Sequence, residues 1–241
     1  MATIYIQSEN GSVPSIFDSS SAMYGAIETG QNYILITNDE VVSGKWDNLI
    51  RTNLFVGSVE FMRNVFSRVG LDNIRVPYNS NRDHIVSTIS EVREKFEKDG
   101  LDVFIKPFKI KEFTGFVLDK WTISMLNPMP DDLEVMVYDK FDHKIVSEFR
   151  CYIHNRQPVY IANYSGGLFY MVDEKYLNDV ISDNDKNNFP VSYTIDIGIL
   201  ENGENVVIEY NDMWAIGNYG MPNDEYLRAL KDRYFQIVKG K

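Results

Sequence analysis

The stretch TIDIGILENGENVVIEYNDMW, residues 194–214, decides the fold prediction because it reads as one β-hairpin. Two runs rich in β-branched residues flank Asn202-Gly203. This dipeptide favours a two-residue type I′ turn, in which both central positions need positive φ. Strands paired symmetrically about that turn place Asp196 directly opposite Glu209. Like charges that face each other across a strand pair are destabilising, so packing alone does not explain the pattern.

The other face of the predicted hairpin is apolar. In the same register, each of three isoleucines faces an apolar partner: Ile195 with Tyr210, Ile197 with Ile208 and Ile199 with Val206. A slip of one residue would bury the acids and expose the isoleucines, so the pattern specifies the register strongly. Asp196, Glu209 and Asn211 are therefore expected together on the face opposite the core.

These three side chains form a hard ligand set made of oxygen donors. Two adjacent carboxylates either share a proton, which raises one pKa, or hold a cation between them. Two carboxylates and an amide suit Mg²⁺ when phosphate oxygens supply the remaining ligands. The alternative is a solvated surface hairpin whose acids splay apart. The loop that follows favours a substrate wall, because it contains Trp214, Gly217, Tyr219 and Gly220.

A polyphosphate needs cations, and a lysine-rich segment offers them. Lys106, in VFIKPF, ends an apolar run that reads as a strand. Lys109 and Lys111 follow, before Thr114-Gly115, where a glycine lets backbone N–H groups approach phosphate oxygens. A lone lysine at a strand end is more often a snorkelling side chain than a catalytic group. The cluster favours a phosphate site and leaves open which of the later two lysines acts.

Composition and charge narrow the class of protein. The chain has 241 residues, of which 44% are hydrophobic, and a net charge of -11. Such a chain is globular, and its charge argues against a general nucleic-acid binder, because phosphate contacts need clustered Lys and Arg. The single cysteine, Cys151, excludes a disulfide framework, and the three histidines lack metal-ligand spacing. With neither a leader nor a long apolar run, we expect a cytoplasmic protein without nucleic-acid or membrane partners.

The order of predicted elements indicates an α/β start followed by α+β parts. Strands are expected at Thr3–Gln7, Tyr33–Thr37 and Asn73–Pro77, with a helix from the N-cap Ser58 to Gly70. Apolar residues at helical spacing predict a second helix ending at Asp99-Gly100: Ile85, Ile89, Val92 and Phe96. Two strand-like runs follow within residues 102–118 and three more within residues 134–164, and a last helix begins near Pro222.

Three motifs together resemble the ATP-grasp superfamily over residues 80–241: the strand lysine in FIKPF, the run EVMVY followed by SEFR, and the D…ExN pattern of Asp196, Glu209 and Asn211. More narrowly, FIKPFKIKEFTG, SEFRCYI and IEYNDMWAIGNYG resemble a mostly phage and bacterial clade marked by one arginine and two lysines. The resemblance implies the α+β ATP-grasp fold, whose two α+β subdomains hold ATP between antiparallel sheets. The expected domains are residues 1–78 on the substrate side, 79–134 as the central or lid subdomain, and 135–241 with the metal site.

The resemblance also implies contacts with the nucleotide. Lys106 would contact the α-phosphate and the adenine side, and Lys109 or Lys111 the β- and γ-phosphates beside Thr114-Gly115. Three consecutive residues would contact adenine through their backbone groups: Met136, Val137 and Tyr138. Glu148, which shares one strand face with Arg150, would bind the ribose hydroxyls.

The metal and catalytic residues follow from the same resemblance. Asp196, Glu209 and Asn211 would bind two Mg²⁺ ions, with Mn²⁺ as an alternative. Arg150, the expected catalytic residue together with Lys111, would lie near the γ-phosphate or an acyl phosphate. Many members have an arginine two residues before the first metal aspartate, where this chain has Thr194. We expect Arg150 to replace it.

The implied activity is an ATP-dependent carboxylate–amine ligase that forms an amide through an acyl phosphate and releases ADP and phosphate. Its partners would be ATP, a carboxylate substrate and an amine acceptor, which is a small molecule, a peptide or a protein. Two alternatives remain: a phosphotransferase that stops after phosphoryl transfer, and a nucleotide-binding module without turnover. A phage source would place the protein in the host cytoplasm.

Overall fold

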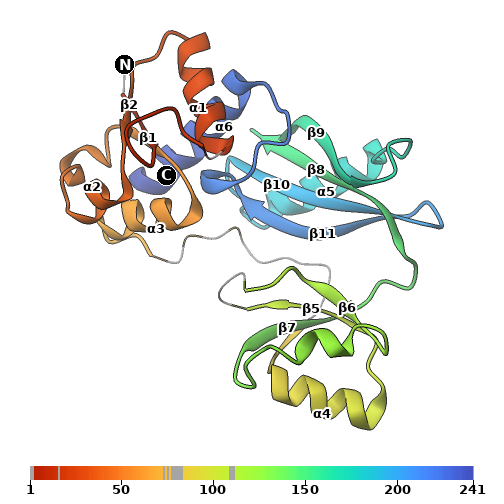
Figure 1. Ribbon diagram of the computed structural model, residues 1–241. Helices are drawn as coiled ribbons and strands as arrows, with labels where there is room; N and C mark the ends of the chain where they lie inside the picture. The colour runs from red at the N-terminus through yellow and green to blue at the C-terminus, as the bar shows by residue number, and fades with distance from the viewer. Residues whose placement is uncertain are drawn as a thin grey trace. The chain divides into compact units, whose positions relative to one another are not determined.

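The computed structural model describes residues 3–15, 17–72, 74, 76, 84–108 and 112–240. The chain divides into two compact units, one made of residues 1–79 with 145–241 and the other of residues 80–144 (Figure 1). The predicted division into three domains stays a prediction. Across the described ranges, no helix is long and apolar enough to cross a membrane.

A parallel sheet opens the first unit. Its strands β1 (Ile4–Gln7), β2 (Tyr33–Ile36) and β3 (Leu54–Val56) lie in the order β2-β1-β3. The described helical segments beside them are α1 (Phe17–Glu28), α2 (Asn38–Val42), the 3-10 helix η1 (Asp47–Leu49) and α3 (Val59–Ser67). Parallel strands need long crossover connections, and these helices supply them. The α/β character expected of this part is confirmed.

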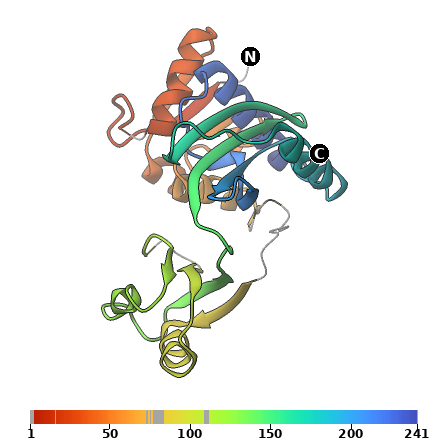
Figure 2. The same cartoon turned by 90° about the vertical axis from the view of Figure 1, so that its right-hand side faces the viewer.

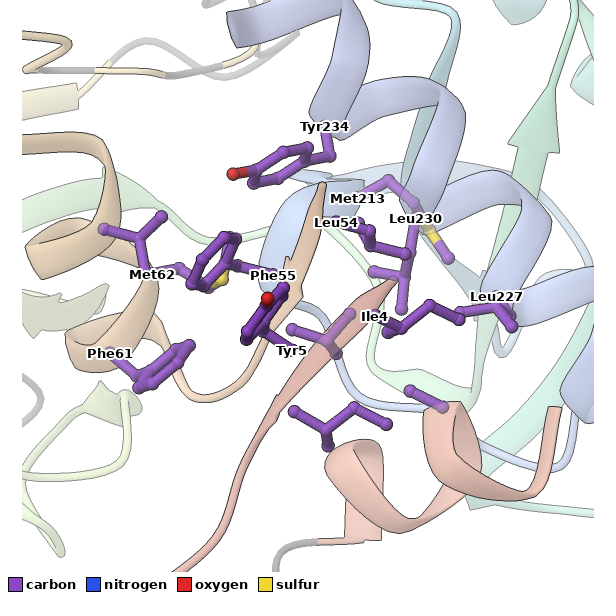
Figure 3. Close-up of a cluster of buried hydrophobic side chains, with 14 of the residues drawn as sticks. Ile4, Tyr5, Leu54, Phe55, Phe61, Met62, Met213, Leu227, Leu230 and Tyr234 are labelled. Atoms are coloured by element: carbon purple, nitrogen blue, oxygen red, sulfur yellow. The ribbon is translucent and has the colours of Figure 1, made fainter. Parts of the chain in front are cut away.

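The parallel sheet shares one hydrophobic core with the last helix, α6 (Asn223–Lys239). Figure 3 shows side chains of both in one cluster: Ile4, Tyr5, Leu54, Phe55, Leu227, Leu230 and Tyr234. The hydroxyl of Tyr234 donates to the backbone carbonyl of Ile50 at 2.7 Å, which satisfies the polar end of a buried ring. The two ends of the chain are therefore held by a common apolar core.

An antiparallel sheet forms the other half of the first unit. Its strands are β8 (Ile145–His154), β9 (Gln157–Gly166), β10 (Ser192–Leu200) and β11 (Asn205–Asp212), in the order β11-β10-β8-β9. Helix α5 (Glu174–Lys186) contributes Leu177 and Ile181 to a core that contains Ile195 and Ile197 of β10. The apolar face predicted for the hairpin is thus confirmed as core. Every residue of β10 is buried, because strands flank it on both sides.

The turn of the β10–β11 hairpin differs from the prediction. The N–H of Gly203 donates to the carbonyl of Leu200, and the N–H of Leu200 donates to the carbonyl of Glu204, both at 2.8 Å. Three residues therefore form the loop. Gly203 has a φ of 88°, while Asn202 is not among the described residues with positive φ. The predicted two-residue type I′ turn is wrong, and the loop ends instead in a left-handed glycine.

A β-bulge restores the predicted register before the strands reach the acids. Near the turn, Ile197 pairs with Val207 and not with Ile208. Ile208 is the extra residue of a bulge, which lies between two strand pairs of different register. Beyond it, Asp196 pairs with Glu209 as predicted. The pairing of the acids thus depends on two irregularities whose offsets cancel.

The second unit is an antiparallel sheet with a helix on one face. Its strands β4 (His84–Thr88), β5 (Val103–Pro107), β6 (Phe116–Leu118) and β7 (Glu134–Asp139) lie in the order β4-β7-β5-β6. Helix α4 (Ile89–Asp99) covers one face (Figure 2), and the 3-10 helix η2 (Ile123–Leu126) packs beside it. The expected strands in this segment are confirmed. β7, which contains the expected adenine-contacting residues, belongs to this sheet.

Two other predictions have different outcomes. The helix expected from Ile85 begins later, because Ile85 lies in β4 and Thr88 forms a capping box with Glu91 at the start of α4. The strand expected at Asn73–Pro77 falls mostly outside the described residues. The last helix is confirmed, with Pro222 as its N-cap.

We predict that Gly203→Ala destabilises the first unit by about 1–2 kcal/mol, because a Cβ is strained in the left-handed region. Chemical denaturation measures the change. Gly203→Asn is the matched control, since Asn adopts this conformation far more readily, and it should be milder. Equal losses for the two variants would contradict the left-handed turn.

Candidate functional site

Three charged side chains form one row across the antiparallel sheet. Arg150 of β8 pairs with Asp196 of β10, and Asp196 pairs with Glu209 of β11. Directly opposed residues on neighbouring strands point to the same face. The row therefore carries one positive and two negative charges, with Asp196 in the middle.

Arg150 and Asp196 form a buried bidentate ion pair. Nε of Arg150 donates to Oδ1 of Asp196 at 2.8 Å, and Nη2 donates to Oδ2 at 2.7 Å. The two side chains are only 9% and 3% exposed. Burial raises the pKa of Asp196 to about 6 although Arg150 lowers it, and the charge of Glu209 raises it further. The repulsion between the acids is therefore opposed by a cation on the other side of Asp196.

A second row lies beside the first and contains Tyr152, Thr194 and Asn211. Nδ2 of Asn211 donates to Oε1 of Glu209 at 3.1 Å, so the amide lies against the acid row as the D…ExN pattern predicts. Thr194 is fully buried, and its hydroxyl has no hydrogen-bond partner within the described part of the chain. The expected exchange of roles between this position and Arg150 stays a prediction.

The donor set fits a magnesium ion that phosphate completes. Asp196, Glu209 and Asn211 lie at neighbouring positions of β10 and β11. No group of three or more His, Cys, Asp or Glu among the described residues could hold a metal ion. Mg²⁺ is commonly bound by one or two carboxylates together with substrate phosphates and water. Two carboxylates and an amide match that habit.

Glu148 lies two residues before Arg150 on β8, beside the acid row. Its Oε2 accepts a hydrogen bond of 2.8 Å from the hydroxyl of Tyr164. The ring of Tyr164 stacks on Tyr219, with 5.3 Å between the ring centroids. The guanidinium carbon of Arg150 lies 4.7 Å from the centroid of Tyr219. Both β8 residues predicted for the site therefore contact one pair of aromatic rings.

The loop after β11 borders the site, as expected of a substrate wall. It follows the 3-10 helix η3 (Met213–Ala215). The hydroxyl of Tyr152 donates to the carbonyl of Gly217 at 2.5 Å and accepts from the N–H of Tyr219 at 2.9 Å. A Cβ placed on Gly217 would lie 3.6 Å from Nη1 of Arg150. The loop is thus fixed against the strand that presents the arginine.

Asp18, near the start of α1, joins the same neighbourhood. A carboxylate oxygen of Asp18 accepts the N–H of Asn218 at 2.9 Å. Burial raises the pKa of Asp18, although the Asn218 hydrogen bond and the charge of Arg150 lower it. The sequence prediction missed Asp18 and also missed Tyr152 and Tyr164, because no spacing signal connects these residues with the hairpin.

In the second unit, the predicted lysine lies among aromatic residues. Lys106 pairs with Met136 of β7, and its ammonium lies 5.3 Å from the ring centroid of Tyr138. A Cβ placed on Gly115 would approach Cβ of Lys106 to 2.9 Å and the carbonyl oxygen of Ile105 to 3.0 Å. Glycine at position 115 therefore permits a close contact between this segment and β5. The fold brings these predicted residues together.

Other predicted phosphate contacts are less defined. Lys109 and Lys111 lie outside the described residues, so the choice between them stays open. Thr114 is exposed next to Gly115. The individual roles assigned to all these residues stay predictions.

The fold and its two antiparallel sheets define an ATP-grasp protein, and a comparison with protein families agrees. Residues 80–229 match the model of an ATP-grasp domain, family 2 of the clade named for one arginine and two lysines. This match covers more than half of the chain, and the chain belongs to that family. The fold class implied by the sequence motifs is confirmed.

Solved structures share the fold at low sequence identity. The D-alanine–D-alanine ligase from Bacillus anthracis, solved with ATP, matches with a TM-score of 0.63 and 12% identity, over 99% of this chain and 98% of that chain. The RimK domain ATP-grasp protein from Sphaerobacter thermophilus matches with a TM-score of 0.56 and 9% identity, over 95% and 99%. The ATP-grasp ligase PsnB, solved with its precursor peptide PsnA2 and AMPPNP, matches with a TM-score of 0.54 and 10% identity, over 97% of each chain. No curated protein sequence matches significantly.

We predict that Arg150→Met destabilises the first unit by about 3–5 kcal/mol, because Asp196 loses its partner while buried beside Glu209. Chemical denaturation at pH 7 measures the loss. The double variant Arg150→Met/Asp196→Asn should lose less than the two single losses together.

The control for that prediction is Arg68→Met, which breaks an ion pair with Asp47 in which both side chains are 38% exposed. Solvent screens such a pair, so the change should be much smaller. Equal effects of the two arginine variants would contradict the importance of the buried pair.

Proposed function

We propose that the protein is a Mg-ATP-dependent carboxylate–amine ligase. The observation that carries the proposal is the row of Arg150, Asp196 and Glu209, with Asn211 beside it, in a chain of the ATP-grasp family. These residues supply one cation and a set of oxygen donors. Phosphoryl transfer needs mainly positioning and charge neutralisation, and this site can provide both.

Magnesium would be held by Asp196, Glu209 and Asn211. When bound, it would bridge phosphate oxygens and neutralise charge that develops during transfer. Arg150 would stay charged, because burial lowers its pKa less than the contact with Asp196 raises it. Its guanidinium would therefore be a permanent cation for the γ-phosphate or the acyl phosphate.

The second unit would contribute the remaining nucleotide contacts. Lys106 would contact the α-phosphate and the adenine side, and Lys109 or Lys111 the β- and γ-phosphates next to Thr114-Gly115. Backbone groups of residues 136–138 would contact adenine. Support comes from the arrangement of Lys106 against β7, the strand that carries those backbone groups.

The reaction would have two steps. An oxygen of the substrate carboxylate attacks the γ-phosphorus, the bond to the bridging oxygen of ADP breaks, and an acyl phosphate forms. The nitrogen of the amine then attacks the acyl carbon, inorganic phosphate leaves, and the amine loses a proton to give the amide. Two of the similar structures are ligases, one solved with ATP and one with a precursor peptide, which keeps both small and peptidic acceptors in view.

Hydroxylamine trapping tests the ligase activity. We expect that incubation with ATP, Mg²⁺ and pools of amino acids or short peptides as carboxylates yields ADP, phosphate and a hydroxamate detectable by mass spectrometry, because hydroxylamine intercepts an acyl phosphate. ADP with a stable phosphorylated product and no hydroxamate would instead identify a phosphotransferase. Absence of nucleotide binding would contradict both activities.

The metal assignment has its own test. We predict that Glu209→Gln abolishes magnesium-dependent ATP turnover and weakens Mg-ATP binding by at least about tenfold, since an amide replaces a charged ligand. The fold should be retained, because the substitution removes the charge next to Asp196. Calorimetric titration of Mg-AMPPNP measures the affinity.

Glu204→Gln is the matched control for this test, because Glu204 lies exposed at the turn of the same hairpin. It should bind like the wild type. Wild-type affinity and turnover in Glu209→Gln would rule out the proposed metal set.

A further inference from the structure

Tyr164 occupies a bulge beside the two site residues of β8. The register between β8 and β9 shifts between Glu148 and Phe149, which leaves Tyr164 as the extra residue of β9. A bulge re-aims a side chain and is frequent next to active sites. Here it places a tyrosine against both Glu148 and Arg150.

The hydroxyl of Tyr164 fixes one oxygen of Glu148. It donates to Oε2 at 2.8 Å. Burial, together with the charges of Asp196 and Glu148, raises the pKa of Tyr164, so the phenol keeps its proton and acts as a donor. A carboxylate has two oxygens that accept hydrogen bonds. Holding one of them sets the direction in which the other faces a ligand.

The ring of Tyr164 is itself held in place. It stacks on Tyr219 at 5.3 Å with an interplanar angle of 28°, and the guanidinium carbon of Arg150 lies 5.8 Å from its centroid. Arg150 is in turn fixed by the two hydrogen bonds to Asp196. A continuous series of contacts therefore links the proposed metal ligand Asp196 to Glu148.

We propose that Tyr164 is a positioning residue that makes nucleotide binding selective for ribose over deoxyribose. It acts through Glu148, whose orientation it fixes for hydrogen bonds from the ribose hydroxyls. The inference rests on the proposed function, since it requires Glu148 to face the ribose. A tyrosine that served only packing would affect the stability of the sheet and leave the preference for the sugar unchanged.

The test compares the affinities of ATP, 2′-deoxy-ATP and 3′-deoxy-ATP, measured by calorimetry with Mg²⁺ on the full chain. Wild type is expected to bind ATP at least about tenfold more tightly than one of the deoxy analogues, because a hydrogen bond to a charged group is lost. Tyr164→Phe keeps the ring and loses the donor. It should weaken ATP about five- to tenfold, leave the deoxy analogue nearly unchanged, and so bring the ratio close to one.

Two further variants separate positioning from packing. Tyr160→Phe, on the same strand and next to Tyr152, is the control and should keep the wild-type ratio. Glu148→Gln should reduce the ratio by itself, and Tyr164→Phe added to it should reduce the ratio no further. An additional loss in the double variant would overturn the inference, because Tyr164 would then act independently of Glu148.

The remaining outcomes distinguish this inference from the proposed function. Failure of the wild type to bind any nucleotide would contradict the proposed function. A wild type that binds ATP without a preference for the sugar, or Tyr164→Phe with the wild-type preference, would overturn the role of Tyr164 alone. Thermal unfolding of each variant checks that phenylalanine keeps the fold, and the Glu148→Gln ratio tests the ribose contact without any change at Tyr164.

Discussion

The buried ion pair between Arg150 and Asp196 is the interaction on which the site depends. Asp196 lies on a strand whose every residue is buried, and Glu209 is its neighbour on the next strand. Without a cation, two carboxylates in this position would have to share a proton or separate. The bidentate contact holds Asp196 in a fixed orientation and keeps Arg150 charged at the same time. A pair of this kind gives little net stability compared with an apolar pair, so function explains its presence better than folding does.

The register of the sheet decides whether that pair can form. A three-residue loop at Gly203 shifts the strands by one position, and the bulge at Ile208 shifts them back. Either irregularity alone would place Asp196 opposite a residue of the other face, because side chains alternate along a strand. The bulge lies directly beside the acids, as the bulge at Tyr164 lies beside Glu148. Local departures from regular pairing therefore aim the side chains of the site on both sides of β8 and β10.

The sequence predicted the parts of this arrangement that depend on patterns along one strand pair. The apolar isoleucines, the pairing of Asp196 with Glu209 and the last helix follow from alternation, periodicity and capping residues. The turn type was wrong because Asn-Gly suits both two-residue and three-residue loops, and a bulge has no signature in a single sequence. Helices α1 and α5 and strand β3 escaped prediction, since the first follows a Ser- and Gly-rich stretch and β3 has only three residues. Contacts such as that of Asp18 with Asn218 join residues almost two hundred positions apart and depend on tertiary folding alone.

Strand β8 explains why one rigid element can organise several tasks. Its residues Glu148, Arg150 and Tyr152 alternate onto one face, and each contacts a different part of the first unit. Glu148 meets β9 through Tyr164, Arg150 meets β10 through Asp196, and Tyr152 holds the loop at Gly217. Tyr152 also belongs to the core that contains the N-terminal sheet and α6. Because strands hold side chains more precisely than loops do, a site built in this way needs little rearrangement within the unit when a ligand arrives. The N-terminal residues expected on the substrate side are thus packed against the same strand that carries the charged site, and changes in that core should reach the site through Tyr152.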